Sequence, residues 1–187
     1  MTLSCLPERT TPPRDNGVTM MMDKGLSISQ LESFLETSSD FTDVVKFGFG
    51  TAVISKNLKQ KIKLLKQSGI RPYFGGTLFE LYYVRGQIDD YFRFVDKLQV
   101  DLIEISDGSI ILDHDEKCNL INKYSSNYTV LSEVGSKEEG IIVSPGKWIK
   151  MMSNELQAGS WKVIAEGRES GSVGIFRPNG NPHTMLI

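Results

Sequence analysis

This sequence of 187 residues has little cysteine, no long apolar run and little net charge, and each shortage excludes a class of protein. The two cysteines, Cys5 and Cys118, are too few and too far apart for a disulfide framework or a zinc site. No apolar run approaches the ~18–20 residues that span a membrane, and the N-terminus lacks the apolar core of a signal peptide. We therefore expect a cytoplasmic protein without a membrane partner.

The charge pattern also argues against a nucleic-acid partner. The net charge is −2, and no cluster of lysine and arginine is interleaved with aromatic residues. Residues 56–66 are rich in lysine, but Leu58, Ile62 and Leu65 recur there at helical spacing. This spacing favours the solvated face of an amphipathic helix over a phosphate-binding patch.

Several catalytic motifs are missing as well. The sequence contains no P-loop, no H-E-x-x-H, no G-x-S-x-G and no cysteine–histidine pairing, which excludes NTPases, zinc proteases and Ser/Cys hydrolases. No expected strand is followed by G-x-G-x-x-G, so the dinucleotide fingerprint is absent. His114 and His183 lack metal-ligand spacing, and we assign them no role.

What the sequence does contain is a repeated strand ending. Residues 128–137, YTVLSEVGSK, begin as a β-branched apolar run and end in Glu133, a glycine and Lys137. This order is typical of a buried strand that presents charged groups at its C-terminal end. An apolar run followed by an acid and a glycine recurs at 102–108 and 162–171. The repetition predicts that several strands direct charged groups to one rim.

Strands alternate with helices along the whole chain. The expected strands are 18–22, 43–47, 70–74, 101–106, 128–133 and 161–166. The expected helices are 29–37, with Ser27 or Ser29 as its cap, 56–67, 78–84, 88–98, 115–124 and 148–158. This alternation predicts a parallel sheet covered by helices, and a TIM (β/α)8-type barrel fits it better than a doubly wound sheet. We place an irregular leader at 1–16 and a single, incomplete barrel domain at 17–187.

The number of units falls short of a closed barrel. Such a barrel has eight βα units, and we expect only about six in this chain. Residues 174–180 predict a short hairpin with Asn179 and Gly180 as its turn. Either the chain is C-terminally truncated, or the sheet stays open and a partner covers it. Exposed sheet edges would favour self-association, so we expect a homo-oligomer.

The charged groups at the rim allow two interpretations. The acidic candidates are Asp23, Glu104, Glu133 and Glu166. Crowded carboxylates repel one another unless a cation neutralises them, and oxygen ligands of this kind suit Mg²⁺. Alternatively, the same acids form a structural ring of ion pairs with basic residues. Those basic residues are Lys24, Lys46, Lys137 and Arg168.

The lysines and glycines are ambiguous in the same way. Lys46 lies within an apolar strand, where a buried lysine is costly unless it is paired, whereas Lys137 alone would pass for a loop lysine. The glycines of 48–51 and 75–77 either let backbone N–H groups approach an anion or serve plain loop geometry. Composition and spacing thus predict an anion-binding, metal-dependent α/β enzyme without naming its substrate.

Six motifs together resemble the phosphosulfolactate synthases, in order and over residues 17–176. They are MDKG (22–25), VKFGFGT (45–51), FGGTLFE (74–80), EISDGS (104–109), LSEVGSK (131–137) and EGRESG (166–171). The resemblance implies a TIM barrel and the Mg²⁺-dependent addition of sulfite to phosphoenolpyruvate, a carbon–sulfur lyase reaction. Its product would be (2R)-phospho-3-sulfolactate, which leads to coenzyme M in methanogens and is associated with sulfolactate in bacteria.

The resemblance also implies residue roles. The lysine after E-V-G is the family's proposed general acid, and here it is Lys137. Acids such as Glu104, Glu133 or Glu166 would hold Mg²⁺. Binding of phosphate or sulfite would fall to a basic set, namely Lys46 and Arg168 with Lys24 behind them.

Two alternatives stay open at this point. A plant branch of the family is associated with heat stress, so the chain could be a non-catalytic or binding relative. It could also be a Schiff-base aldolase that uses Lys46. Ser136 stands where archaeal members commonly have lysine, and that difference would alter anion binding.

Overall fold

Every strand pairs in parallel with the next strand along the chain in the computed structural model. The strands are β1 (Met20–Asp23), β2 (Val44–Phe47), β3 (Arg71–Phe74), β4 (Leu102–Ser106), β5 (Thr129–Val134) and β6 (Lys162–Ala165). The structure describes residues 4–5, 8, 10–135, 143–167, 170–177, 179–182 and 184. All six expected strands are therefore present, each within a few residues of its predicted position.

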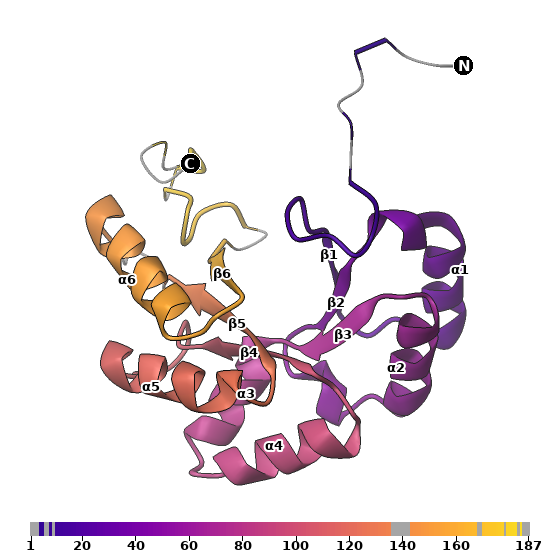
Figure 1. Cartoon of the computed structure of the whole chain (residues 1–187), viewed down its shortest axis with the longest axis horizontal. Helices are drawn as coiled ribbons and strands as arrows, with labels where there is room; N and C mark the ends of the chain where they lie inside the picture. The colour runs from indigo at the N-terminus through magenta and orange to yellow at the C-terminus, as the bar shows by residue number, and fades with distance from the viewer. Residues whose placement is uncertain are drawn as a thin grey trace.

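A helix or a pair of helices follows each of the first five strands. They are α1 (Ile28–Ser38), α2 (Leu58–Gln67), α3 (Gly76–Tyr83), α4 (Ile88–Lys97), α5 (His114–Ser125) and α6 (Pro145–Gln157), with short 3-10 turns at Ser39–Phe41 and Thr51–Val53. The sheet curls, and the helices surround it from outside (Figure 1). This is the TIM-barrel type of α/β fold, as the sequence predicted, with six parallel strands of which five are followed by a helix in the described part of the chain.

Local capping explains where three helices begin. Ser27 forms a capping box with Gln30 at the start of α1, which confirms one of the two expected caps. The Asp113 side chain accepts from two backbone N–H groups at the start of α5. Ser144 caps α6, and Pro145 occupies its first turn. The expected start of this helix at 148 was therefore too late, because the capping signal precedes the apolar pattern.

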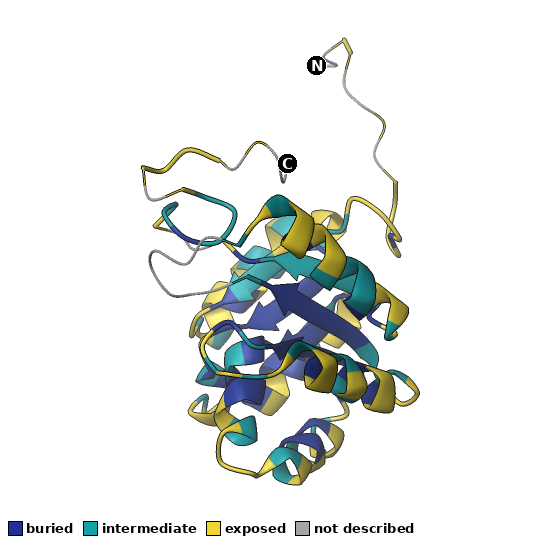
Figure 2. Ribbon diagram, turned by 90° about the vertical axis from the view of Figure 1, so that its left-hand side faces the viewer, coloured by how far each residue is buried: buried dark blue, intermediate teal, exposed yellow. Residues whose placement is uncertain are grey.

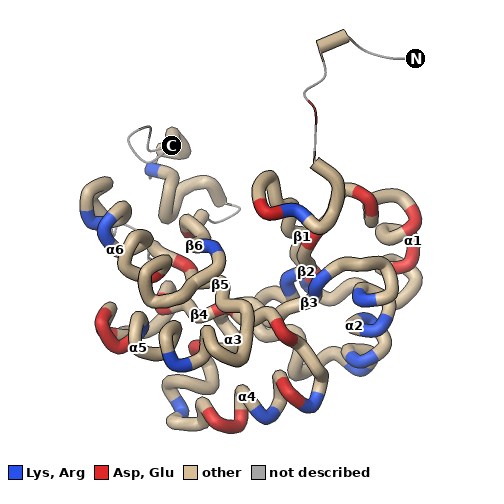
Figure 3. The backbone as a smooth tube through the Cα atoms, viewed as in Figure 1, with Lys and Arg blue, Asp and Glu red and all other residues tan. Residues whose placement is uncertain are grey.

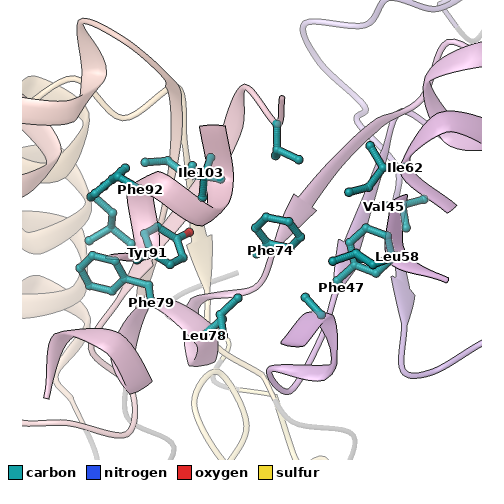
Figure 4. Packing of buried hydrophobic residues seen from close by; sticks show 14 of the residues in the cluster. Val45, Phe47, Leu58, Ile62, Phe74, Leu78, Phe79, Tyr91, Phe92 and Ile103 are labelled. Carbon is teal, nitrogen blue, oxygen red and sulfur yellow. The ribbon is translucent and has the colours of Figure 1, made fainter. Parts of the chain in front are cut away.

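The middle strands of the sheet are buried (Figure 2), and the two faces of the sheet carry different residues. Side chains on the helix-facing side, such as Val45, Phe47 and Phe74, pack with apolar residues of α2, α3 and α4 in the main core (Figure 4). A second, smaller cluster lies on the inner, concave side. Its buried members are Val44, Tyr73, Leu102 and Leu131. Alternate residues of each strand therefore point to the helices and into the barrel.

The sheet is open in the described part of the chain, with β1 and β6 as its two edges. Beyond β6, Phe176 and Pro182 form an isolated antiparallel bridge, and Arg177 donates its N–H to the carbonyl of Asn181 at 2.8 Å. A chain reversal thus exists at the expected hairpin, although its described residues form no regular strand. The expected self-association stays a prediction. None of the described helices has the length and apolarity needed to cross a membrane.

The N-terminal leader is anchored by Arg14, although its described residues form no helix or strand. The Arg14 side chain is only 3% exposed. Its guanidinium donates to Asp43 Oδ1 at 2.9 Å and to the carbonyl oxygens of Thr10 (2.7 Å) and Asp40 (3.0 Å). Asp43 Oδ2 in turn accepts from the N–H of Thr19 at 2.7 Å. The leader is thereby tied to the segment that enters β2.

Replacing Arg14 with alanine should lower the free energy of unfolding by about 3 kcal/mol, because Asp43 would then be a buried charge without its cation. Urea denaturation followed by circular dichroism measures this. Arg93→Ala is the matched control: its side chain is 70% exposed, so a change within about 0.5 kcal/mol is expected. Equal losses in the two variants would show that Arg14 is not an anchor.

Candidate active site

A buried lysine between two glutamates forms the centre of the candidate site. Lys46 Nζ on β2 donates to Glu104 Oε1 on β4 at 2.8 Å and lies 3.5 Å from Glu133 Oε2 on β5. The side chains of Glu104 and Glu133 are 0% and 5% exposed. Three of the residues predicted for the rim are therefore in direct contact, although they lie far apart in the sequence.

The two-residue period of the strands places these groups together. Lys46 follows Val44 by two residues, and Glu104 and Glu133 follow Leu102 and Leu131 in the same way. Because Val44, Leu102 and Leu131 belong to the inner cluster, the charged residues form the next layer of the barrel interior, toward the carboxyl ends of the strands. The apolar layer below them shields the ion pairs from water.

The start of α3 closes over this layer. The N–H of Gly76 donates to Glu104 Oε1 at 2.7 Å, and the Ser106 hydroxyl donates to Glu80 Oε1. A Cβ on Gly76 would lie 2.0 Å from Ser106 Oγ and 2.8 Å from Glu104 Oε1. A Cβ on Gly75 would lie 2.7 Å from Lys46 Cε. The two glycines thus allow the backbone to approach the Glu104 carboxylate, and the binding of a ligand anion by residues 75–77 stays a prediction.

Burial and the neighbouring charges set the ionisation of Glu104. Burial raises the pKa of its carboxyl group above the ordinary value, the Lys46 ammonium opposes this, and the negative charge of Glu133 adds to it. Burial, followed by the charge of Glu104, also raises the pKa of Tyr73, whose ring lies in the inner cluster. The site is therefore a dry region in which added positive charge is strongly stabilised.

Asp23 and its lysine partner lie on the other face of the sheet. Asp23 Oδ2 accepts from Lys61 Nζ on α2 at 2.8 Å, and Oδ1 accepts from the N–H groups of Gly25 and Leu26. These contacts fix the turn after β1, and they involve a lysine that the expected ring of ion pairs did not include; of that ring, the structure shows Lys46 with Glu104 and Glu133. A ligand role for Asp23 stays a prediction.

Two other predicted residues lie near the rim. Lys24 is exposed, with its Nζ 5.8 Å from the centre of the Phe49 ring in the turn after β2. Glu166 is buried just beyond β6, and its N–H donates to the carbonyl of Val134 at 2.9 Å. Lys137 and Arg168 lie outside the described residues, as do Ser136 and His183. Their predicted roles therefore stay predictions.

The lysines of α2 are mostly solvent-exposed, as expected from their spacing (Figure 3). Lys59, Lys63 and Lys66 line a surface groove of about 490 Å³ together with Lys97 at the end of α4. None of the residues lining this groove belongs to the site at the strand ends. Lys61 is the exception on the helix, because it is buried against Asp23.

The acids of the site were tested for their fit to a divalent cation. Among the described residues, no group of three or more His, Cys, Asp or Glu side chains is arranged to hold a metal. However, Glu104 Oε1 accepts from both Lys46 and the N–H of Gly76, whereas the buried Oε2 takes part in neither contact, and a hydrogen bond links the Tyr73 hydroxyl to this carboxyl group. Mg²⁺ commonly takes only one or two carboxylates and completes its shell with water and substrate. Glu104 and Glu133 fit that requirement.

Sequence reasoning missed three residues around Glu104. They are Tyr73, Glu80 and Ser106. Tyr73 was assigned only to a strand. It lies opposite Lys46 in the register of β2 and β3, so the alternation of side chains along the strands could have placed it on the same face as Lys46. Ser106 and Glu80 stand within motifs already singled out, but only the packing of α3 against β4 brings them together.

Comparison with known proteins now identifies the family. The profile of the (2R)-phospho-3-sulfolactate synthase (ComA) family matches residues 7–187. The chain belongs to the phosphosulfolactate synthase family. It is 36% identical over 184 residues to a phosphosulfolactate synthase of Bacillus subtilis (strain 168), covering 97% of this chain and 73% of that protein.

Further comparisons agree with this membership. The phosphosulfolactate synthase of Methanocaldococcus jannaschii is 41% identical over 170 residues, which covers 88% of this chain and 68% of that protein. A crystal structure of 3-hexulose-6-phosphate synthase superposes with a TM-score of 0.50 at 14% identity, over 86% of this chain and 71% of that chain. This last likeness concerns the fold alone, and it supports the barrel type.

Replacing Gly76 with alanine should lower the free energy of unfolding by about 1–3 kcal/mol, because the new Cβ would force α3 away from Ser106 and Glu104. Thermal or urea denaturation measures this loss. Gly146→Ala is the matched control: it lies in α6 with nothing within 4 Å of the added Cβ, and alanine favours helix. A loss in Gly146→Ala as large as in Gly76→Ala would contradict the close contact.

Glu104→Gln should change how stability depends on pH. In the folded protein the pKa of the Glu104 carboxyl group lies above its unfolded value of about 4.5. The protonated carboxyl group therefore stabilises the fold below about pH 4.5, and this stabilisation is lost as the pH rises through the folded-state pKa. The wild type should therefore lose stability relative to Glu104→Gln as pH rises above about 4.5. Urea denaturation at a series of pH values tests this, with Glu36→Gln on α1 as the control for loss of one carboxylate. A wild type that gains stability relative to Glu104→Gln as the pH rises would contradict the raised pKa.

Proposed function

We propose that this chain is a phosphosulfolactate synthase, a carbon–sulfur lyase that adds sulfite to phosphoenolpyruvate in the presence of Mg²⁺. The observation that carries the proposal is the buried Lys46–Glu104–Glu133 cluster in a chain that matches the family profile over residues 7–187. The cluster provides paired charges inside a barrel, at the strand ends where barrel enzymes carry their active sites.

The reaction forms one carbon–sulfur bond and breaks only a π bond. The sulfur lone pair of sulfite attacks the methylene carbon of phosphoenolpyruvate. The electron pair of the C=C bond moves toward the carboxylate, and the resulting enediolate takes a proton at the carbon that bears the phosphate. The product is (2R)-phospho-3-sulfolactate, and the phosphate ester stays intact. The enzyme must therefore bind several negative charges, accommodate a further build-up of charge on the carboxylate and deliver one proton.

The residues of the chain divide these tasks between them. Lys137 would deliver the proton from the loop after β5, as the family resemblance implies. Lys46 would place its ammonium group against the sulfite or phosphate oxygens when an anion enters, since it already lies at the centre of the cluster. Arg168 and Lys24 would add positive charge at the rim. Fixed cations in a water-poor site stabilise anions more than cations in bulk solvent.

Glu104 and Glu133 are the residues that would hold Mg²⁺, with Glu166 as a further candidate at the end of β6. Bound Mg²⁺ supplies positive charge for the carboxylate of the substrate, where negative charge accumulates during the addition. The buried Glu104 Oε2, which neither Lys46 nor the N–H of Gly76 engages, supports this assignment. Asp23 is a weaker candidate because Lys61 and two backbone N–H groups already engage it.

The contacts of Lys46 weigh against the Schiff-base aldolase. A Schiff base requires a neutral amine, which enzymes obtain by apolar surroundings or by neighbouring cations. Lys46 instead lies between two carboxylates, which favour its charged form. No specific observation favours the non-catalytic relative, and it is an outcome of the experiment below.

Phosphorus NMR of the purified chain with phosphoenolpyruvate, sulfite and Mg²⁺ tests the proposal. We expect a new phosphate-ester signal that requires both sulfite and Mg²⁺, with omission of each as a control. Borohydride trapping of a carbonyl substrate on Lys46 would instead indicate the aldolase. Phosphoenolpyruvate that stays unchanged, together with no measurable affinity for it, would overturn the synthase in favour of the non-catalytic relative.

The same assay tests the general acid. Lys137→Ala should lower kcat by about 10²–10⁴-fold, the usual contribution of a positioned proton donor. Lys150→Ala, on the exposed side of α6, is the control for loss of one lysine and should keep the wild-type rate. Near-wild-type turnover in Lys137→Ala would require another proton donor.

A further inference from the structure

Lys117 on α5 is a third buried lysine, after Lys46 and Lys61, and the reaction described above does not use it. Its side chain is 0% exposed. The ammonium group donates to Asp107 Oδ1 at 2.8 Å and to the backbone carbonyl of Glu133 at 2.6 Å, and it forms an ion pair with Glu155 Oε1 at 2.8 Å. An ammonium group is costly to bury in a protein interior, and these three partners offset that cost.

These contacts join four elements around one nitrogen atom. Lys117 belongs to α5, Asp107 follows β4, Glu133 belongs to β5 and Glu155 belongs to α6. The two strands concerned are the ones that carry Glu104 and Glu133 into the site. The network lies on the helix-facing side of the sheet, because α5 and α6 pack there against β4 and β5.

Lys117 reaches the site only through the backbone of β5. The side chain of Glu133 points into the barrel toward Lys46, whereas its carbonyl oxygen accepts from Lys117. Lys137, the proposed proton donor, follows Glu133 by four residues in the sequence. The ammonium therefore holds the end of the strand that carries Glu133 into the site.

The charges around Lys117 keep it in its protonated form. Burial alone would lower its pKa, but the carboxylates of Glu155 and Asp107 outweigh burial and raise it. Burial raises the pKa of Glu155, while Lys117 and a hydrogen bond from Ser132 act in the opposite direction. The Ser132 hydroxyl also accepts from Ser160 at 2.9 Å, which links the network to the start of β6.

We propose that Lys117 is a positioning residue, whose ammonium group fixes the carboxyl ends of β4 and β5 and thereby the placement of Glu104 and Glu133. The activity part of this proposal rests on the synthase function proposed above. A small displacement of reacting groups is costly, since about 1 Å of misplacement can lower a rate about 10²-fold.

The experiment compares Lys117→Met with Ile121→Ala in the full chain. Methionine keeps the length of the side chain and removes the ammonium. Ile121 is the matched control: it lies one turn further along α5, is 0% exposed, packs in the main core and has no polar group that could bond to the Glu133 carbonyl. The first measurement, made without substrate, is hydrogen exchange of peptides that contain β5, with global stability determined by urea denaturation.

We expect faster hydrogen exchange at the end of β5 in Lys117→Met than in Ile121→Ala. The exchange rates of each variant are first corrected for the change in its own global free energy of unfolding. In the synthase assay, Lys117→Met should lower kcat per folded molecule at least about tenfold and raise KM for phosphoenolpyruvate. Ile121→Ala should stay within about twofold of wild type in both. A smaller folded fraction cannot raise KM, so this change separates positioning from simple destabilisation.

If Lys117→Met does not fold, Lys117→Met/Glu155→Gln replaces it, because the second change removes one of the carboxylates left without a cation. Equal β5 exchange in the lysine variant and in Ile121→Ala would overturn the positioning role. An inactive wild type would count against the synthase function alone, and the exchange measurement would still decide whether Lys117 holds the strand end.

Discussion

The buried ion pairs of Lys46 with Glu104 and Glu133 are the interaction around which the barrel interior is arranged. Charges inside a protein are stable only when they are paired and when neighbouring groups complete their hydrogen bonds. Here the N–H of Gly76 donates a hydrogen bond to one oxygen of Glu104. An apolar layer that includes Tyr73 and Leu102 excludes water from the side below. The glycines at the start of α3 follow from this constraint, since any side chain there would collide with the carboxylate or the lysine.

A second layer of buried charge supports the first from outside the sheet. Lys61 fixes the turn after β1 through Asp23, and Lys117 fixes the ends of β4 and β5 through Asp107 and the carbonyl of Glu133. These lysines do not enter the barrel. Each one ties the carboxyl end of a strand to a helix, so the inner groups depart from anchored backbone. An architecture of this kind separates the groups that we propose to meet the substrate from the groups that hold the strands.

Strand and helix positions were predictable because both faces of a barrel strand are buried, and apolar runs between turn residues are a strong signal. The residues of the site were partly predictable for the same reason: Lys46, Glu104 and Glu133 interrupt such runs, and a parallel sheet brings their ends to one rim. The start of α6 was placed too late, because a serine cap and a proline precede its apolar stripe. Asp23 was grouped with the other acids, although it lies on the opposite face from Lys46, one residue out of phase in the strand register.

The sequence by itself determined the fold class, the order of the strands and the types of charged group at their ends, because period and local capping are properties of neighbouring residues. Only the tertiary structure decided which charges meet. Lys46 pairs with residues 58 and 87 positions away, and Lys117 reaches a backbone carbonyl that no sequence pattern marks. Such contacts depend on the curvature of the sheet and on helix packing, and these arise from the whole chain at once.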